Sequence, residues 1–142
     1  LNPAITVGLA TVKKIKIQDA ALYIIAQVVG AIVAMFVAKA LMGASPALTA
    51  TDTISIGLAE ALGAFLLAFG VAGVVYNKVD DDASGLVVGS SLFLGIMVAS
   101  TLGNGVINPA VAVGIGSLSL MYVLGPLVGG IVGVWVMHYL SK

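Results

Sequence analysis

The chain has 142 residues, of which 61% are hydrophobic and only 8% are charged, and its formal net charge is zero. A soluble domain carries about 25% charged residues, so this little charge excludes a water-facing surface over most of the molecule. The neutral balance also argues against nucleic acid as a partner, and the absence of cysteine excludes disulfides and Cys-metal sites. The composition therefore indicates an integral membrane protein.

The first predicted element is a short apolar helix at about 2–11, which opens on an Asn-Pro-Ala tripeptide. Proline suits the first helical position, where its missing N–H costs nothing, and the preceding Asn suits the N-cap. The segment is too apolar for a loop and too short to cross a bilayer, which takes about 17–25 residues. We therefore expect a half-helix that enters the membrane and does not cross it.

Four apolar runs then follow in chain order, at 19–41, 54–75, 86–102 and 118–140. Each has about the length that spans a bilayer as a helix. Turn-forming residues separate them at 43–46, 77–85 and 103–105. The acidic run at 80–82 is expected to be a solvated cytoplasmic loop.

A second Asn-Pro-Ala tripeptide opens another short segment, about 109–117, between the third and fourth runs. Residues 1–10 match 107–116 at five of ten positions, and the helices from Tyr23 and Tyr122 also match at several offsets. The sequence therefore contains an internal repeat. Small residues recur every four positions at 125, 129 and 133, a spacing that lets membrane helices approach closely.

The lysines predict the orientation. Positions 13, 14 and 16 precede the first span, and counting spans puts Lys78 and Lys142 on the same side, with only Lys39 toward the other face. An excess of lysine marks the cytoplasmic side. The counting works only if the second short segment enters and leaves by one face. The two repeats are then inverted, a design that places a solute site at the bilayer midplane.

Two half-helices that enter from opposite faces would meet with their N-termini together. Their positive dipole ends would add at one point, which disfavours a cation. The carboxamides of Asn2 and Asn108 would offer hydrogen-bond donors there to a neutral solute. The residues themselves thus predict a pore for small uncharged molecules.

The chain resembles the aquaporin and glycerol-facilitator family along its whole length. The first motif is similar to the family's HxNPAVT stretch, 23–31 to its YxxAQxxGA pattern, and 125–129 to its GPxxG. In the family two further helices precede the first motif. The resemblance implies an inverted-repeat, all-α bundle in which residues 1–142 form one transmembrane domain, truncated at its N-terminus by those two helices.

The resemblance also implies the site. The pore residues are Asn2, Pro3, Ala4, Asn108, Pro109 and Ala110, the filter residues are Val111 and Ile96, and the loop supports are Glu60 and Gln27. Glu60 sits where the family's fourth helix carries a buried Glu that holds the half-helix loop. From its own chemistry, Gln27 is equally consistent with a contact to the first half-helix loop or with pairing across helices.

The departures from the family concern solute choice. The filter usually has an Arg directly after the second motif, whereas this chain has Val111 and no Arg anywhere. Ungapped counting back from Asn108 puts Ile96 where water channels often have a His. Glycerol facilitators usually have an Asp at the position of Ala112, and Gly116 and Tyr122 resemble the water-channel pattern. The pattern favours the water-type branch with an apolar filter.

The functional prediction is a passive channel for water and other small neutral solutes. A glycerol, urea or ammonia facilitator and a non-conducting structural membrane protein stay open as alternatives. No nucleophile–base pair, metal cluster or phosphate loop supports an enzyme, and no cofactor is expected. The resemblance implies a homotetramer in the lipid bilayer. We expect a multi-pass protein of the plasma membrane with the 13–16 loop and the C-terminus in the cytoplasm.

Overall fold

The computed structural model describes residues 1–44 and 48–142, and this part of the chain is helical. The long helices are α2 (Ile17–Met42), α3 (Ile54–Val75), α4 (Asp81–Ala99) and α6 (Leu120–Leu140), and the short ones are α1 (Pro3–Thr11) and α5 (Pro109–Gly114). Each long helix is long and apolar enough to cross a membrane. The predicted all-α membrane bundle with four spans and two short helices is confirmed. The turn expected at 43–46 falls partly on residues 45 and 46, which lie outside the described residues.

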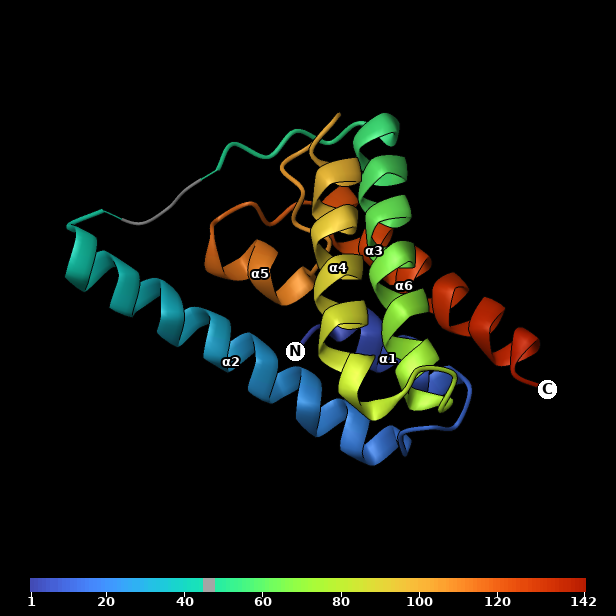
Figure 1. The fold of residues 1–142 in the computed structure, drawn as a ribbon. Helices are drawn as coiled ribbons and strands as arrows, with labels where there is room; N and C mark the ends of the chain where they lie inside the picture. The colour runs from blue at the N-terminus through green and yellow to red at the C-terminus, as the bar shows by residue number, and fades with distance from the viewer. Residues whose placement is uncertain (45–47) are drawn as a thin grey trace.

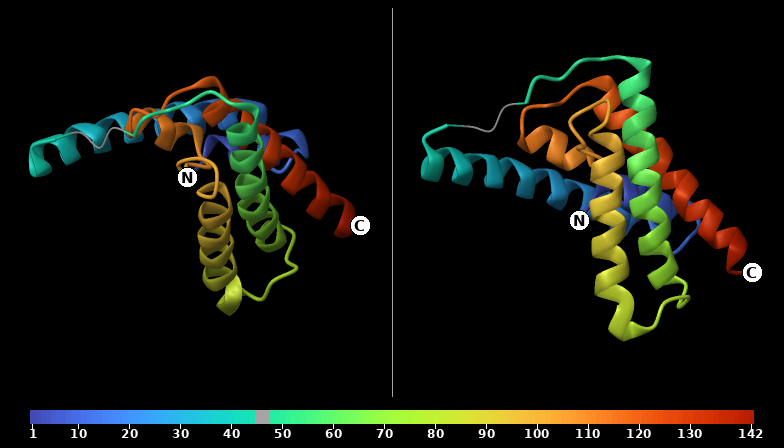
Figure 2. Two further views of the ribbon diagram at one scale, coloured as in Figure 1. Left: turned by 90° about the horizontal axis from the view of Figure 1, so that it is seen from above. Right: turned by 45° about the horizontal axis from the view of Figure 1, so that its top comes forward.

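Helix α3 is the centre of the arrangement (Figure 1). It packs along α6 and α4, and α1 packs against α6. Helix α2 runs away from this group and, within the described residues, packs only against α1 and α5 (Figure 2). The two short helices therefore lie between α2 and the other long helices.

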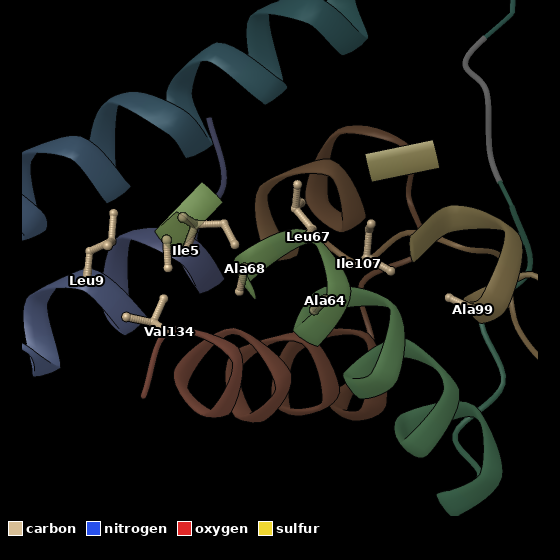
Figure 3. Close-up of a cluster of buried hydrophobic side chains, with 9 residues drawn as sticks. Ile5, Leu9, Ala64, Leu67, Ala68, Ala99, Ile107 and Val134 are labelled. Atoms are coloured by element: carbon tan, nitrogen blue, oxygen red, sulfur yellow. The ribbon is translucent and has the colours of Figure 1, made fainter. Parts of the chain in front are cut away.

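The hydrophobic core joins both short-helix regions to α3. Its buried side chains come from α1, α3, α4, α6 and the loop before α5, and Figure 3 shows them around the middle of α3. They are Ile5, Leu9, Ala64, Leu67, Ala68, Ala72, Ala99, Ile107 and Val134. The large apolar side chains of the spans mostly point outward instead, as hydrocarbon surroundings permit.

Glycines set the contact between α3 and α6. A Cβ added at Gly129 would lie 1.9 Å from the carbonyl oxygen of Ala61, and one at Gly125 would lie 2.5 Å from that of Gly57. No side chain fits between the helices at these points. The four-residue spacing at 125, 129 and 133 therefore brings one face of α6 directly against the backbone of α3.

The start of α4 corrects the prediction for the acidic run. The expected span began at 86 and the expected loop included 80–82, but Asp80 is the N-cap and Asp81 and Asp82 lie in the first helical turn. Negative side chains are favourable at the positive end of a helix, so the aspartates begin the helix instead of ending the loop. The helix also ends earlier than expected, at Ala99 instead of 102.

The short helix α5 is also shorter than predicted. It ends at Gly114 instead of 117, because Gly116 has a φ of 68° that a right-handed helix cannot continue. Helix α6 begins at Leu120 instead of 118, after Ser119 in extended conformation. Its first N–H groups are bonded from the connection between α2 and α3: Met121 donates to Asp52 Oδ1 at 3.0 Å and Leu120 to Oδ2 at 3.4 Å.

The hydrogen bonds that Asp52 accepts from the first turn of α6 predict that the attachment of this turn depends on pH. The hydrogen bond from the Met121 N–H lowers the pKa of Asp52 below its ordinary value of 3.8. A lowered pKa means stabilisation that is present above that ordinary value and is lost as the pH falls through the folded-state pKa. We expect Asp52→Asn to lower the thermal midpoint at neutral pH and the difference to shrink as the pH falls below 3.8, because the wild-type carboxyl then becomes protonated. Midpoints measured from pH 7 to pH 3 check this, and a pH-independent difference would contradict it.

Candidate pore site

The two Asn-Pro-Ala motifs begin α1 and α5 in the same way. Each Asn is an N-cap in extended conformation and each Pro is the first helical residue. The Asn2 side chain accepts from the N–H of Ala4 at 2.9 Å, and Asn108 Oδ1 accepts from that of Ala110 at 3.0 Å. The side-chain oxygen thus satisfies an N–H that the helix itself cannot, and the amide group is left to point beyond the helix end.

The two helix N-termini meet. Asn2 Nδ2 donates to the carbonyl oxygen of Ile107 at 2.9 Å, and Asn108 Nδ2 donates to that of Leu1 at 3.0 Å. Each carboxamide therefore reaches the residue that precedes the other motif. This reciprocal pair fixes the two half-helices end to end, so their positive dipole ends are directed at the same region.

A cavity of about 620 Å³ opens at this meeting point. Both capping asparagines line it, together with Thr6, Gln27 and Tyr23 from the first repeat. The remaining wall is mostly apolar and includes Leu9, Leu67, Val71, Val88 and Leu92. In the parts of the chain that the structure describes, no charged side chain lines the cavity. It offers amide donors and a few hydroxyl and carbonyl groups against an apolar wall.

Both predicted filter residues face this cavity. Val111, in the first turn of α5, is 39% exposed and Ile96, near the end of α4, is 38% exposed. The structure therefore brings together the two positions that the sequence could relate only through the family resemblance. Their role in selecting solutes stays a prediction. The side chains present are apolar, so neither donates a hydrogen bond into the cavity.

Glu60 holds the loop before α5. It is fully buried on α3, and its carboxylate accepts from the N–H groups of Val106, at 2.9 Å, and Ile107. Ile107 has a φ of 46°, a left-handed conformation that is a clear outlier for a β-branched residue. In that conformation its N–H points to Glu60 while its carbonyl accepts from Asn2. The carboxylate thus stabilises a strained residue next to the second motif.

Gln27 pairs with the first half-helix. Its Nε2 donates to Thr6 Oγ1 at 2.9 Å, and Thr6 donates in turn to the carbonyl of Asn2 at 3.1 Å. Of the two arrangements left open by the sequence, this is a contact across helices to α1 itself. The chain of bonds ties Gln27, a buried residue of the mostly exposed α2, to the residue that caps α1.

Sequence reasoning missed two contacts of the loop between α4 and α5. The hydroxyl of Tyr122 accepts from the N–H of Asn104 at 2.9 Å, and Asn104 Nδ2 donates to the carbonyl of Thr49 at 3.0 Å. The repeat of Tyr23 and Tyr122 was visible in the sequence, but nothing in it distinguishes the buried phenol from the one that lines the cavity. The left-handed backbone of Ile107 had no signal either, because isoleucine does not favour it.

The comparisons with known proteins agree with this geometry. The chain belongs to the major intrinsic protein family, whose model matches residues 1–137. Aquaporin NIP1-1 of Zea mays is 29% identical over 94% of this chain and 52% of its own length. Glycerol uptake facilitator protein-like 6 of Lactiplantibacillus plantarum is 36% identical over 92% of this chain and 68% of its own length. Aquaporin AqpM of Methanothermobacter thermautotrophicus is 30% identical over all of this chain and 67% of its own length.

The chain thus spans about half the length of the plant relative and about two thirds of the two microbial ones. Family membership, together with four helices that can each cross a bilayer, makes it part of an integral, multi-pass membrane protein.

Proposed function

We propose that residues 1–142 form one transmembrane domain that carries the pore of a passive channel for water and small neutral solutes. The observation that carries the proposal is the reciprocal contact of the Asn2 and Asn108 carboxamides at one cavity. Two capped helix ends place amide donors and positive dipoles together, and no charged side chain of the described residues lines the cavity there. Such a site favours a neutral molecule that accepts hydrogen bonds.

Ion exclusion follows from the same arrangement. Each helix end is equivalent to about half a positive charge, and the two act on the same short region. A cation there meets an unfavourable potential and also loses hydration water to an apolar wall. Among the described residues the exclusion rests mainly on the helix ends, because Val111 stands at the position where a fixed cation is usual in the family that the sequence resembles.

Water is the first solute proposed, and small neutral solutes such as glycerol, urea or ammonia are the second. The side chains of Val111 and Ile96 are apolar, and neither holds a solute by hydrogen bonds. They therefore favour weak discrimination between water and other small neutral solutes. The names of the relatives include both aquaporins and a glycerol uptake facilitator. The third alternative is a non-conducting structural protein, which a flux measurement distinguishes from both channels because it would conduct neither water nor solute.

We further propose a plasma-membrane protein with the Lys13–Lys16 turn and the C-terminus in the cytoplasm. The Lys14 ammonium lies 4.2 Å from the centre of the Tyr76 ring, and the Tyr76 hydroxyl lies 2.6 Å from His138 Nδ1. These contacts join the α1–α2 turn to the end of α3 and the end of α3 to the end of α6, which supports placing all three on one side of the membrane. The positive-inside rule makes the side with the excess of lysine cytoplasmic. A homotetramer would cover part of the exposed apolar faces of the long helices.

The test compares solute and water flux in proteoliposomes that contain the full chain or its Val111→Arg variant. We expect wild-type liposomes to shrink in an osmotic gradient faster than protein-free ones. An Arg at 111 narrows the cavity and adds a charge and hydrogen-bond donors. Water is small enough to pass the narrower cavity, so water flow should persist. The ratio of glycerol to water flux should fall about tenfold, the change that about 1.4 kcal/mol produces.

Val111→Leu is the matched control, because it adds bulk without charge. It should lower the ratio less than Arg does and leave the proton leak unchanged, whereas Arg should reduce the leak. Wild-type shrinkage no faster than that of empty liposomes would refute the channel. An unchanged ratio in Val111→Arg would show that another residue sets the constriction.

A further inference from the structure

The loop before the second motif, residues 103–107, is anchored from α3 by Glu60 and also from α6, besides the bond of its Asn104 side chain to Thr49. The anchor from α6 is the Tyr122 hydroxyl, which accepts from the N–H of Asn104 at 2.9 Å. Glu60 lies on α3 and bonds the end of the loop, at Val106 and Ile107. Tyr122 lies on α6 and bonds its beginning. The loop is therefore held at both ends, by two different helices.

The geometry of Tyr122 suits an anchor. The side chain is 1% exposed, and its ring belongs to a buried cluster with Val106 of the loop and Ala112 of α5. A Cβ built on Gly103 would lie 3.2 Å from the Tyr122 hydroxyl and 3.3 Å from Glu60 Oε1, so the chain at 103 passes directly against both anchors. One side chain thus contacts the loop with its hydroxyl and shares a buried cluster with residues of the loop and the half-helix.

The anchored loop is a wall of the cavity. Gly105, Val106 and Ile107 line it, and the carbonyl of Ile107 receives the Asn2 amide. A shift of the loop therefore changes the width of the cavity and the direction of its carbonyl groups. Glu60 bonds the N–H groups of Val106 and Ile107, and the N–H of Asn104 has the Tyr122 hydroxyl as its acceptor.

We propose that Tyr122 is a positioning residue of the pore, whose hydroxyl sets the place of the cavity-lining loop and thereby the size of solute that passes. The part of this inference that concerns solute size rests on the function proposed above. The part that concerns the loop does not.

The experiment uses Tyr122→Phe in the full chain, reconstituted in liposomes, because Phe keeps the ring and removes only the hydroxyl. Tyr139→Phe is the matched control: it lies on the same helix and its side chain is 75% exposed. Amide hydrogen exchange is measured across 103–107, and glycerol and water fluxes are measured on the same preparations.

In Tyr122→Phe the exchange of the Asn104 amide should rise about two- to tenfold, the range that one net hydrogen bond supports. The amides of Val106 and Ile107 should stay near wild type, because Glu60 still holds them. The glycerol-to-water flux ratio should rise about twofold or more as the loop loosens. Tyr139→Phe should change none of these quantities.

A purely structural role would instead lower the amount of assembled protein and reduce both fluxes in proportion, which would overturn the proposal. Unchanged exchange at Asn104 would overturn the anchor, and raised exchange with an unchanged flux ratio would overturn the positioning of the pore. If the wild type conducts nothing, the proposed function fails while the exchange at Asn104 still decides the anchor. Should Tyr122→Phe not assemble, a fluorinated tyrosine at 122 keeps the hydroxyl but is a weaker acceptor, and raised exchange at Asn104 is again the supporting result.

Discussion

Glu60→Leu should destabilise the protein by about 2–6 kcal/mol and prevent the loop before α5 from keeping its place. The substitution leaves the N–H groups of Val106 and Ile107 buried without an acceptor, and each unsatisfied group costs about 1–3 kcal/mol. Ile107 would also lose the partner that holds its left-handed backbone. Assembled protein recovered from membranes, and its resistance to thermal unfolding in detergent, measure the effect.

Glu60→Gln is the matched variant, because it keeps the shape of the side chain and one acceptor oxygen. Its amide group opposes one of the two N–H donors, so its stability should lie between those of Glu60→Leu and the wild type. Equal stability of the Leu variant and the wild type would show that the carboxylate does not hold the loop.

The other large effect is expected at the contact between α3 and α6. Gly129→Ala places a methyl group 1.9 Å from the carbonyl oxygen of Ala61, a backbone atom that cannot rotate away. The two helices must then separate along a face that is close from 125 to 133. The loss should reach or exceed the upper end of the about 1–3 kcal/mol that overpacking costs.

Gly85→Ala on α4 is the control, since nothing lies within 4 Å of a Cβ at that position. It should leave the thermal midpoint in detergent unchanged or raise it slightly, because Ala is the better helix former. A Gly129→Ala protein as stable as Gly85→Ala would contradict the close approach of α3 and α6.

The spans could be predicted where short-range chemistry marks both ends. The span at 54–75 was predicted at both boundaries from its apolar run, which coincides with the helix that Thr53 caps and that turn residues follow. The acidic residues at 80–82 misled the prediction, since the same side chains suit a solvated loop and the first turn of a helix. Composition cannot separate these two cases when the helix that follows is apolar.

The contacts of the candidate site likewise divide into those that a local sequence pattern indicates and those that it does not. The caps formed by Asn2 and Asn108 involve N–H groups within three residues, so the tripeptides alone indicate them. The contacts of Tyr122 with Asn104 and of Asp52 with Met121 join residues 18 and 69 positions apart and carry no local pattern. Nothing near Ile107 in the chain announces its positive φ, because the conformation is imposed by Glu60 and Asn2 from other elements.

The end-to-end meeting of α1 and α5 has a consequence for the direction of the proposed solute flux. The electrostatic potential along the proposed pore is highest where the two capped ends meet and falls away on either side, because each half contributes one helix of the same polarity relative to the centre. The repeat also places an uncharged side chain at both equivalent positions, Ile5 and Val111. If the chain is the channel proposed above, the described residues at its centre give no charge asymmetry that would rectify flux, so equal and opposite gradients should drive equal fluxes inward and outward.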